Sequence, residues 1–147
     1  MIFDRQYEPS PWEPIAEQVE LYESTDGVEG GDFMGGACVI LTSIGARSGN
    51  LRKTPLIRVT DGTNYVVIGS VGGAPNNPKW VYNLRAEPRV QLRDGAQVNE
   101  YVAREVTDAE EKATWWELAT SVWSDYDVYQ SSTDRIIPLF VLEPGDV

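Results

Sequence analysis

The sequence has no histidine, and Cys38 is its only cysteine among 147 residues. Without imidazole, Ser-His-Asp and Cys-His nucleophile arrangements and histidine-ligated metal sites are excluded. A lone cysteine cannot form an intramolecular disulfide, which is typical of a protein in a reducing cytoplasm. Cys38 lies in the apolar segment 37–42, where we expect an inert core residue. The acidic residues show no metal-ligand spacing, so we predict no metal.

Long apolar runs and nucleotide-binding loops are also lacking. No apolar run approaches the roughly 18 residues that a membrane-spanning helix needs. The first 14 residues are acidic and interrupted by proline, unlike a signal peptide. The chain has no G-x-G-x-x-G after a strand and no Walker loop, so a classical dinucleotide or nucleoside triphosphate site is not indicated. We predict one cytoplasmic domain, residues 1–147, in which residues 1–36 form an N-terminal helix and loop.

Basic side chains are scarce at both ends of the chain. The net charge is −11, which argues against nucleic acid as a partner because phosphate binding requires a basic face. Residues 1–46 contain one basic side chain and residues 94–147 contain three, whereas residues 47–93 contain eight against two acids. This basic segment in an acidic chain indicates a local anion site. Alternatively, its charges only cover solvent-facing sides of strands.

Apolar periodicity predicts an α+β fold. Helical spacing and capping residues indicate helices, the last with a Thr107–Glu110 capping box; their ranges are 14–23, 78–86 (with Asn77 as N-cap) and 108–122. Alternating or continuous β-branched runs indicate strands at 37–42, 53–60, 64–70, 89–93, 97–106 and 136–144. Residues 124–135 are predicted to form a loop or a single turn. Antiparallel hairpins dominate, so we expect a small antiparallel barrel with three flanking helices.

The first candidate for chemistry is the segment GARSGNLRKTPL, residues 45–56. Arg47 lies in a predicted hairpin turn, and Arg52 and Lys53 begin the next strand. Arginine offers bidentate geometry to phosphate or carboxylate, and Ser48 and nearby backbone amides add hydrogen-bond donors. These residues are predicted to converge on one anion.

Two further segments carry candidate residues. In SVGGAPNNPKW, residues 70–80, two glycines precede a helix N-terminus, which favours negative charge. Trp80 lies one turn into this helix, where its ring either stacks on a flat cofactor or fills the core. In YDVYQ, Tyr126 and Tyr129 lie on one side of a helical turn, and each phenol can donate a hydrogen bond. Without histidine, a tyrosine is the best candidate for a proton donor; the alternative is a pair of surface aromatics.

Three motifs together resemble a known family. They are ILTSIGARSGNLRKTPL, GGAPNNPKWVYNL and YDVYQSSTDRIIP, which occur in this order within residues 37–144. The chain resembles the deazaflavin-dependent nitroreductase family of actinobacteria, whose cofactor is coenzyme F420. The resemblance implies an FMN-binding-like split β-barrel. It also implies hydride transfer from reduced F420 to a small-molecule electron acceptor: a nitro compound, a quinone or an activated enone.

The resemblance also implies roles for individual residues. Tyr126 would close the pocket, with Tyr126, Tyr129 and Ser70 as catalytic hydrogen-bond donors to the acceptor. The cofactor-binding residues that it implies are Ala46, Arg47, Ser48, Arg52, Lys53, Thr54, Pro55, Leu56, Ile57, Ile68, Gly69, Ser70, Val71, Lys79, Trp80, Val81, Tyr82, Asn83 and Tyr126.

Two positions depart from the family pattern. Val71 stands where relatives often have lysine, which removes a charge from the phosphate site. Trp123 stands where some relatives have tyrosine. Two alternatives remain: an FMN-dependent oxidoreductase on the same barrel, and a non-catalytic binder of the cofactor or of a hydrophobic ligand. We expect a monomer or homodimer, with contact between the N-terminal helix and the inner face of the membrane as an option.

Overall fold

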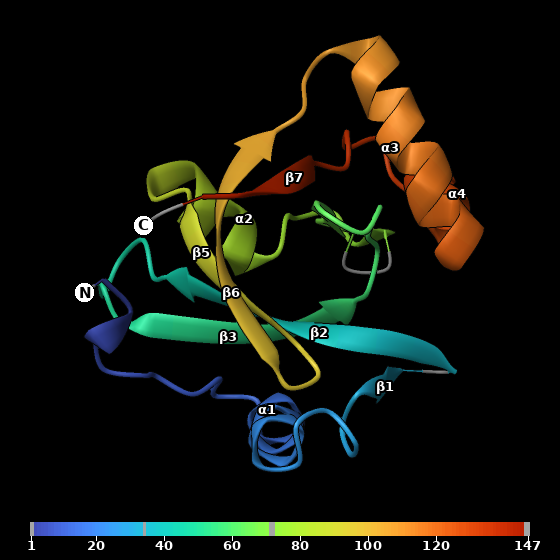
Figure 1. Ribbon diagram of the computed structural model, residues 1–147. Helices are drawn as coiled ribbons and strands as arrows, with labels where there is room; N and C mark the ends of the chain where they lie inside the picture. The colour runs from blue at the N-terminus through green and yellow to red at the C-terminus, as the bar shows by residue number, and fades with distance from the viewer. Residues whose placement is uncertain (1, 34, 71–72, 146–147) are drawn as a thin grey trace.

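The computed structural model describes residues 2–33, 35–70 and 73–145 (Figure 1). The elements in chain order are η1 (Ile2–Asp4), α1 (Glu13–Ser24), β1 (Asp32–Phe33), β2 (Gly36–Ile44), β3 (Leu51–Ile57), β4 (Tyr65–Ile68), α2 (Lys79–Ala86), β5 (Arg89–Asp94), β6 (Gln97–Glu105), α3 (Ala109–Val122), α4 (Asp125–Ser131) and β7 (Leu139–Pro144).

The strands form one antiparallel sheet that curls into an open barrel. One edge of β2 pairs with β3 and the other with β1 and β5, and the sheet continues through β6 and β7 to β4. In the described part of the chain, β3 and β4 meet only at the base of their hairpin, where the Val66 amide donates to the Val59 carbonyl at 2.9 Å. The sheet is therefore open between β3 and β4. The predicted α+β class and split antiparallel barrel are confirmed.

Alternating side chains fill the interior of the barrel. The inward residues of the strands and one face of α2 pack in a single cluster, which comprises Val39, Leu41, Val67, Trp80, Val81, Leu84, Val90, Leu92, Tyr101, Ala103, Phe140 and Leu142. The position of α2 depends on Gly69, because a Cβ atom there would lie 2.7 Å from Val81 Cγ2. Helix α2 therefore closes one side of the barrel directly against the end of β4.

Helices cover the outer face of the sheet in two places (Figure 1). Helices α3 and α4 pack over β4 and β7, where Ile68, Val141 and Tyr126 belong to one buried cluster. On the opposite side of the molecule, α1 packs over β2 and β3 through Val19 and Tyr22. Ile57, at the end of β3, contacts both clusters.

Tyr22 links α1 to two parts of the sheet. Its side chain is 1% exposed. Its hydroxyl donates to the Cys38 carbonyl at 3.0 Å and accepts from the Gly95 amide at 2.7 Å. One phenol thus joins α1, the start of β2 and the turn between β5 and β6. The neighbouring Cys38 thiol is buried, and this burial raises its pKa to about 11.

The apolar side of α1 packs against the sheet. Val19 and Tyr22 face the sheet, whereas Glu13, Glu17 and Glu20 are exposed. Within the described ranges, none of the helices has the length and apolarity to cross a bilayer.

Three local predictions differ from the structure. Pro78, not Asn77, is the N-cap of α2, and Asp108 rather than Thr107 caps α3 by accepting from the Glu111 amide. The segment 124–135 contains α4, so four α-helices, not three, are present in the described residues. The two tyrosines lie on one helix, as predicted for a helical turn, but this helix is longer than a single turn.

Replacing Tyr22 with phenylalanine tests the link between α1 and the sheet. We expect Tyr22→Phe to lower the free energy of unfolding by about 1–3 kcal/mol, because the Cys38 carbonyl and the Gly95 amide lose their shared partner. Urea denaturation of the variant measures this loss. Tyr82→Phe is the control, since Tyr82 is 49% exposed; an equal effect of both changes would contradict the role of the Tyr22 hydroxyl.

Candidate active site

Strand β3 presents two different sets of side chains on its two faces. Successive strand residues point to opposite faces, so Arg52 shares its face with Leu56, which packs into the barrel interior. Lys53 points to the other face, where its ammonium lies 2.7 Å from a Glu23 carboxylate oxygen and 4.9 Å from the centre of the Tyr7 ring. The structure therefore does not bring Lys53 together with Arg52.

Acids from the two ends of the chain neutralise most of the basic segment. Each pair joins a basic residue of segment 47–93 to a distant acid: Arg52–Glu8, Lys53–Glu23, Arg58–Asp94, Arg85–Glu105 and Arg93–Asp26. Arg47 and Lys79 are exposed and have no ion-pair partner among residues 2–33, 35–70 and 73–145. Of the predicted anion site, Arg52 and Lys53 therefore pair with Glu8 and Glu23, and Arg47 has no ion-pair partner in the described part of the chain.

A buried asparagine joins the turn that carries Arg47 to α2. Asn83, 8% exposed, accepts from the Ala46 amide at 2.9 Å and donates to the Ser43 hydroxyl at 3.3 Å. Lys79 lies one turn before Asn83 on the same side of α2. The turn and the first residue of α2 are thus held at one end of the barrel.

A carboxylate of the chain itself lies among these residues. Glu8 accepts from Arg52 Nη1 at 2.9 Å and from Asn50 Nδ2 at 3.3 Å. Hydrogen bonds from Asn50 and Ser48 and the charge of Arg52 lower the pKa of Glu8, and the charge of Lys79 adds to this effect. The residues at this corner can therefore hold an oxyanion, which is the property that a phosphate-bearing cofactor requires.

The end of β4 brings a second group of predicted residues to the open edge. The Gly69 amide donates to the Pro138 carbonyl at 2.9 Å and continues the pairing of Ile68 with β7. Ser70 follows with 7% exposure, and its hydroxyl has no hydrogen-bond partner in the part of the chain that the structure describes. Val71 lies outside the described residues.

Tyr126 and Tyr129 project from α4 into the outer cluster. Tyr126 is 6% exposed and packs against the rings of Trp116 and Tyr129 at centroid distances of 6.2 and 6.1 Å. Burial raises its pKa, so its phenol stays protonated. The Tyr126 hydroxyl has no hydrogen-bond partner among the described residues, whereas the Tyr129 hydroxyl accepts from Trp123 Nε1 at 3.2 Å. Of the two phenols, Tyr126 is therefore the stronger candidate for a donor.

The remaining predicted residues divide between core and surface. Trp80 is 5% exposed and packs against Phe140 at a centroid distance of 5.8 Å, so its ring lies in the barrel interior. Val81 is fully buried, whereas Tyr82 is half exposed. Thr54 and Pro55 are partly buried on opposite faces of β3.

Sequence reasoning gave no role to Arg135, which organises the loop after β4. Its guanidinium donates to the carbonyls of Gly69, Ser70 and Ala74 at 2.9 Å each and also to the side chain of Asn77. One side chain thus fixes both ends of the 69–77 segment, including the backbone of Ser70. Arg135 is the only basic residue after Lys112. This isolated position is the sequence feature that could have indicated a specific role for it.

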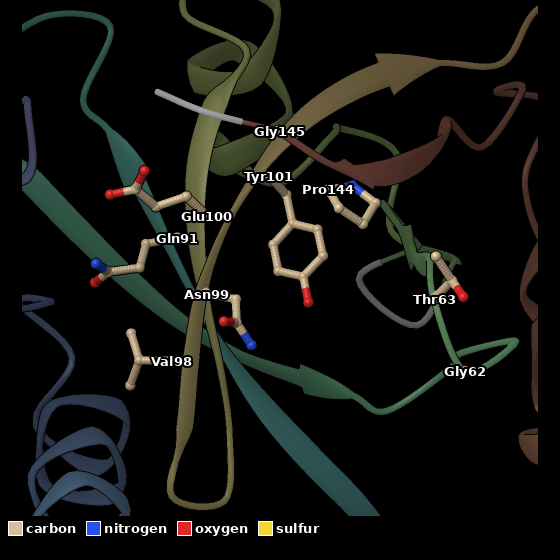
Figure 2. A pocket seen from close by; sticks show the side chains of 9 residues that line it. All are labelled: Gly62, Thr63, Gln91, Val98, Asn99, Glu100, Tyr101, Pro144 and Gly145. Atoms are coloured by element: carbon tan, nitrogen blue, oxygen red, sulfur yellow. The ribbon is translucent and has the colours of Figure 1, made fainter.

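Two hollows on the surface are not lined by predicted site residues. One hollow has a volume of about 890 Å³. In Figure 2 the Tyr101 ring points between β6 and the turn at Gly62 and Thr63. A second hollow, of about 500 Å³, runs along α3 beside Trp116 and Gln130.

Shortening the guanidinium of Arg135 tests its hold on the 69–77 segment. We expect Arg135→Lys to lower the free energy of unfolding by about 1–3 kcal/mol, because an ammonium cannot reach four acceptors in a planar fork. The Gly73 amide, which donates to the Ser70 carbonyl, should then exchange faster with deuterium. Arg104→Lys, at an exposed ion pair with Glu111, is the control and should change stability by less than about 1 kcal/mol. If the Gly73 amide of Arg135→Lys exchanges with deuterium at the wild-type rate, Arg135 does not hold the 69–77 segment.

Comparison with known proteins agrees with the motifs at this edge. An F420H(2)-dependent quinone reductase of Mycobacterium tuberculosis (strain ATCC 25618 / H37Rv) is 32% identical over 125 residues, 83% of this chain and 84% of the relative. A solved F420-H2 dependent reductase (FDR-A) is 41% identical with a TM-score of 0.68, covering 72% of this chain and 93% of that one. A solved domain-swapped dimer is 39% identical with a TM-score of 0.71, covering 91% and 100%.

These likenesses extend over both the barrel and the candidate site. The family model described as F420H(2)-dependent quinone reductase matches residues 15–144, which include β2 to β7 and the helices between them. The chain belongs to the F420H(2)-dependent quinone reductase family.

Proposed function

We propose that this protein reduces quinones with reduced coenzyme F420 as hydride donor. The observation that carries the proposal is the corner of the barrel where Ser48, Asn50 and Arg52 surround a carboxylate, with Arg47 and Lys79 forming no ion pair among the described residues. The tail of F420 contains a phosphate and several glutamates, so it needs clustered cations. In a chain of net charge −11, such a cluster selects a specific anion.

The residues at the open edge fit the two parts of the cofactor. Arg47, Arg52 and Lys79 would hold the anionic tail, and Ser48 would add a hydrogen bond. The end of β4, from Ile68 to Ser70, would lie beside the deazaflavin ring. When bound, the reduced cofactor supplies a hydride, which is two-electron chemistry.

The chain itself would orient and polarise the acceptor. Ser70 and Tyr126 present hydroxyls that have no partner within the described ranges, and both can donate to a quinone oxygen. Because burial raises the pKa of Tyr126, its phenol remains a donor at neutral pH. Aromatic rings around Tyr126, including Trp116, limit access of water to this side. Negative charge that develops on the acceptor oxygen would be stabilised by these two hydrogen bonds.

Nitro compounds and activated enones belong to the wider class of acceptors that the sequence predicts. Each presents an oxygen that gains negative charge on reduction, so Ser70 and Tyr126 could serve them in the same way. A monomer or homodimer, and contact of α1 with a membrane surface, stay predictions.

A fluorescence titration with oxidised F420, run beside FMN, tests the proposed cofactor. We expect saturable binding of F420 and weaker binding of FMN, and Arg52→Ala should weaken F420 binding about tenfold or more through loss of a charge-assisted contact. Steady-state assays with reduced F420 and a panel of quinones, nitro compounds and enones then test turnover. Preference for FMN would support the alternative oxidoreductase, and binding without turnover would support a non-catalytic binder.

Removing one hydroxyl tests the proposed donor. We expect Tyr126→Phe to lower kcat for quinones about 10- to 100-fold, equivalent to about 1.5–3 kcal/mol, while the Kd for F420 changes little. Tyr129→Phe is the comparison, because the Tyr129 hydroxyl already accepts from Trp123 and should matter less. Wild-type kcat in Tyr126→Phe with several acceptors would exclude a role for its hydroxyl.

A further inference from the structure

The N-terminal segment occupies the open edge of β3 at the candidate anion site. The Glu8 amide donates to the Leu51 carbonyl at 2.9 Å, and the Leu51 amide donates to the Gln6 carbonyl at 2.8 Å. Arg5 Nη1 donates to the Gly49 carbonyl at 3.2 Å. Residues 5–8 therefore extend the sheet by a short parallel stretch beside the turn that carries Arg47.

This pairing places the Glu8 carboxylate on the donors that an anionic ligand would use. It accepts from Arg52 and Asn50, and both of its oxygens are engaged. The contact is accessible to water, since the side chains of Glu8 and Arg52 are 43% and 26% exposed. Ion pairs with this exposure are weak and screened by salt, so another anion can displace the carboxylate.

The other acid of the N-terminal region that pairs with β3 does not interfere in this way. Glu23 pairs with Lys53 on the face of β3 that packs under α1, opposite to Arg52. Glu8, in contrast, pairs with Arg52 at the candidate site.

We propose that Glu8 is a specificity-determining residue, an internal anion that competes with the ligand's phosphate for Arg52 and Asn50. The inference rests on the proposed function. Displacing Glu8 costs the same free energy for every ligand whose anion binds Arg52 and Asn50. A ligand without such an anion leaves Glu8 in place. Glu8 therefore lowers the affinity for phosphate-bearing ligands relative to ligands that lack the anion.

Neutralising the Glu8 carboxylate isolates its effect on affinity. Apparent affinity falls in proportion to the fraction of molecules with a free site, so docking of Glu8 in about 80% of molecules weakens binding about fivefold. We expect Glu8→Gln to bind oxidised F420 about fivefold more tightly than wild type at low salt, in a fluorescence titration. The difference in F420 affinity between Glu8→Gln and wild type should become smaller at high salt. The charge-matched control is Glu17→Gln, at an exposed position on α1, which should bind like wild type.

A second ligand identifies the competing group. The same deazaflavin riboside without the phosphate and glutamate tail should bind wild type, Glu8→Gln and Glu17→Gln equally. If Glu8→Gln binds F420 no more tightly than Glu17→Gln, while wild type binds saturably, the inference is wrong and the proposed function stands. If Glu8→Gln binds the tail-free riboside more tightly than wild type by the same factor as it binds F420, competition between Glu8 and the tail is also refuted. If wild type and both variants fail to bind F420, the proposed function falls, and this inference with it.

Discussion

The unpaired edge between β3 and β4 is the constraint on which the site depends. A sheet that curls without closing leaves a row of backbone groups that must be covered or used. Here residues 5–8 cover the start of β3, α2 packs against Gly69 at the end of β4, and α4 covers the outer face beside it. The proposed cofactor site lies along this edge, with Arg52 at the start of β3 and Ser70 just after the end of β4.

Folding pairs basic residues with acids that lie far from them in the sequence. The basic segment 47–93 pairs with acids that precede or follow it, as in Arg52–Glu8 and Arg58–Asp94. These pairs neutralise much of the local excess of positive charge in this segment, whereas Arg47 and Lys79 stay exposed. The alternative interpretation, in which these charges only decorate solvent faces, describes Arg85 and Arg89. It does not describe Arg52, whose partner occupies the candidate site.

The sequence predicted the class of fold and most of the elements, because hairpin signals and apolar periodicity are local. It placed Lys53 beside Arg52, whereas strand alternation sends adjacent side chains to opposite faces. It also missed α4, whose polar composition resembles a loop and whose helical structure is supported by packing of Tyr126. Arg135 and Glu8 were not predicted because their partners are 58 to 66 and 42 to 44 residues away. The resemblance to the family supplied candidate site residues, such as Thr54 and Ile68, that no local pattern assigns.

The buried Cys38 has a practical consequence. Its thiol lies beneath α1, and burial raises its pKa to about 11, so at neutral pH little of the reactive thiolate forms. No other cysteine occurs in the chain. A cysteine introduced on an exposed loop would therefore be modified selectively by maleimide reagents, with the native thiol left in place. A dye attached in this way near residue 5 would report on release of the N-terminal segment as it happens, without redesign of the protein interior.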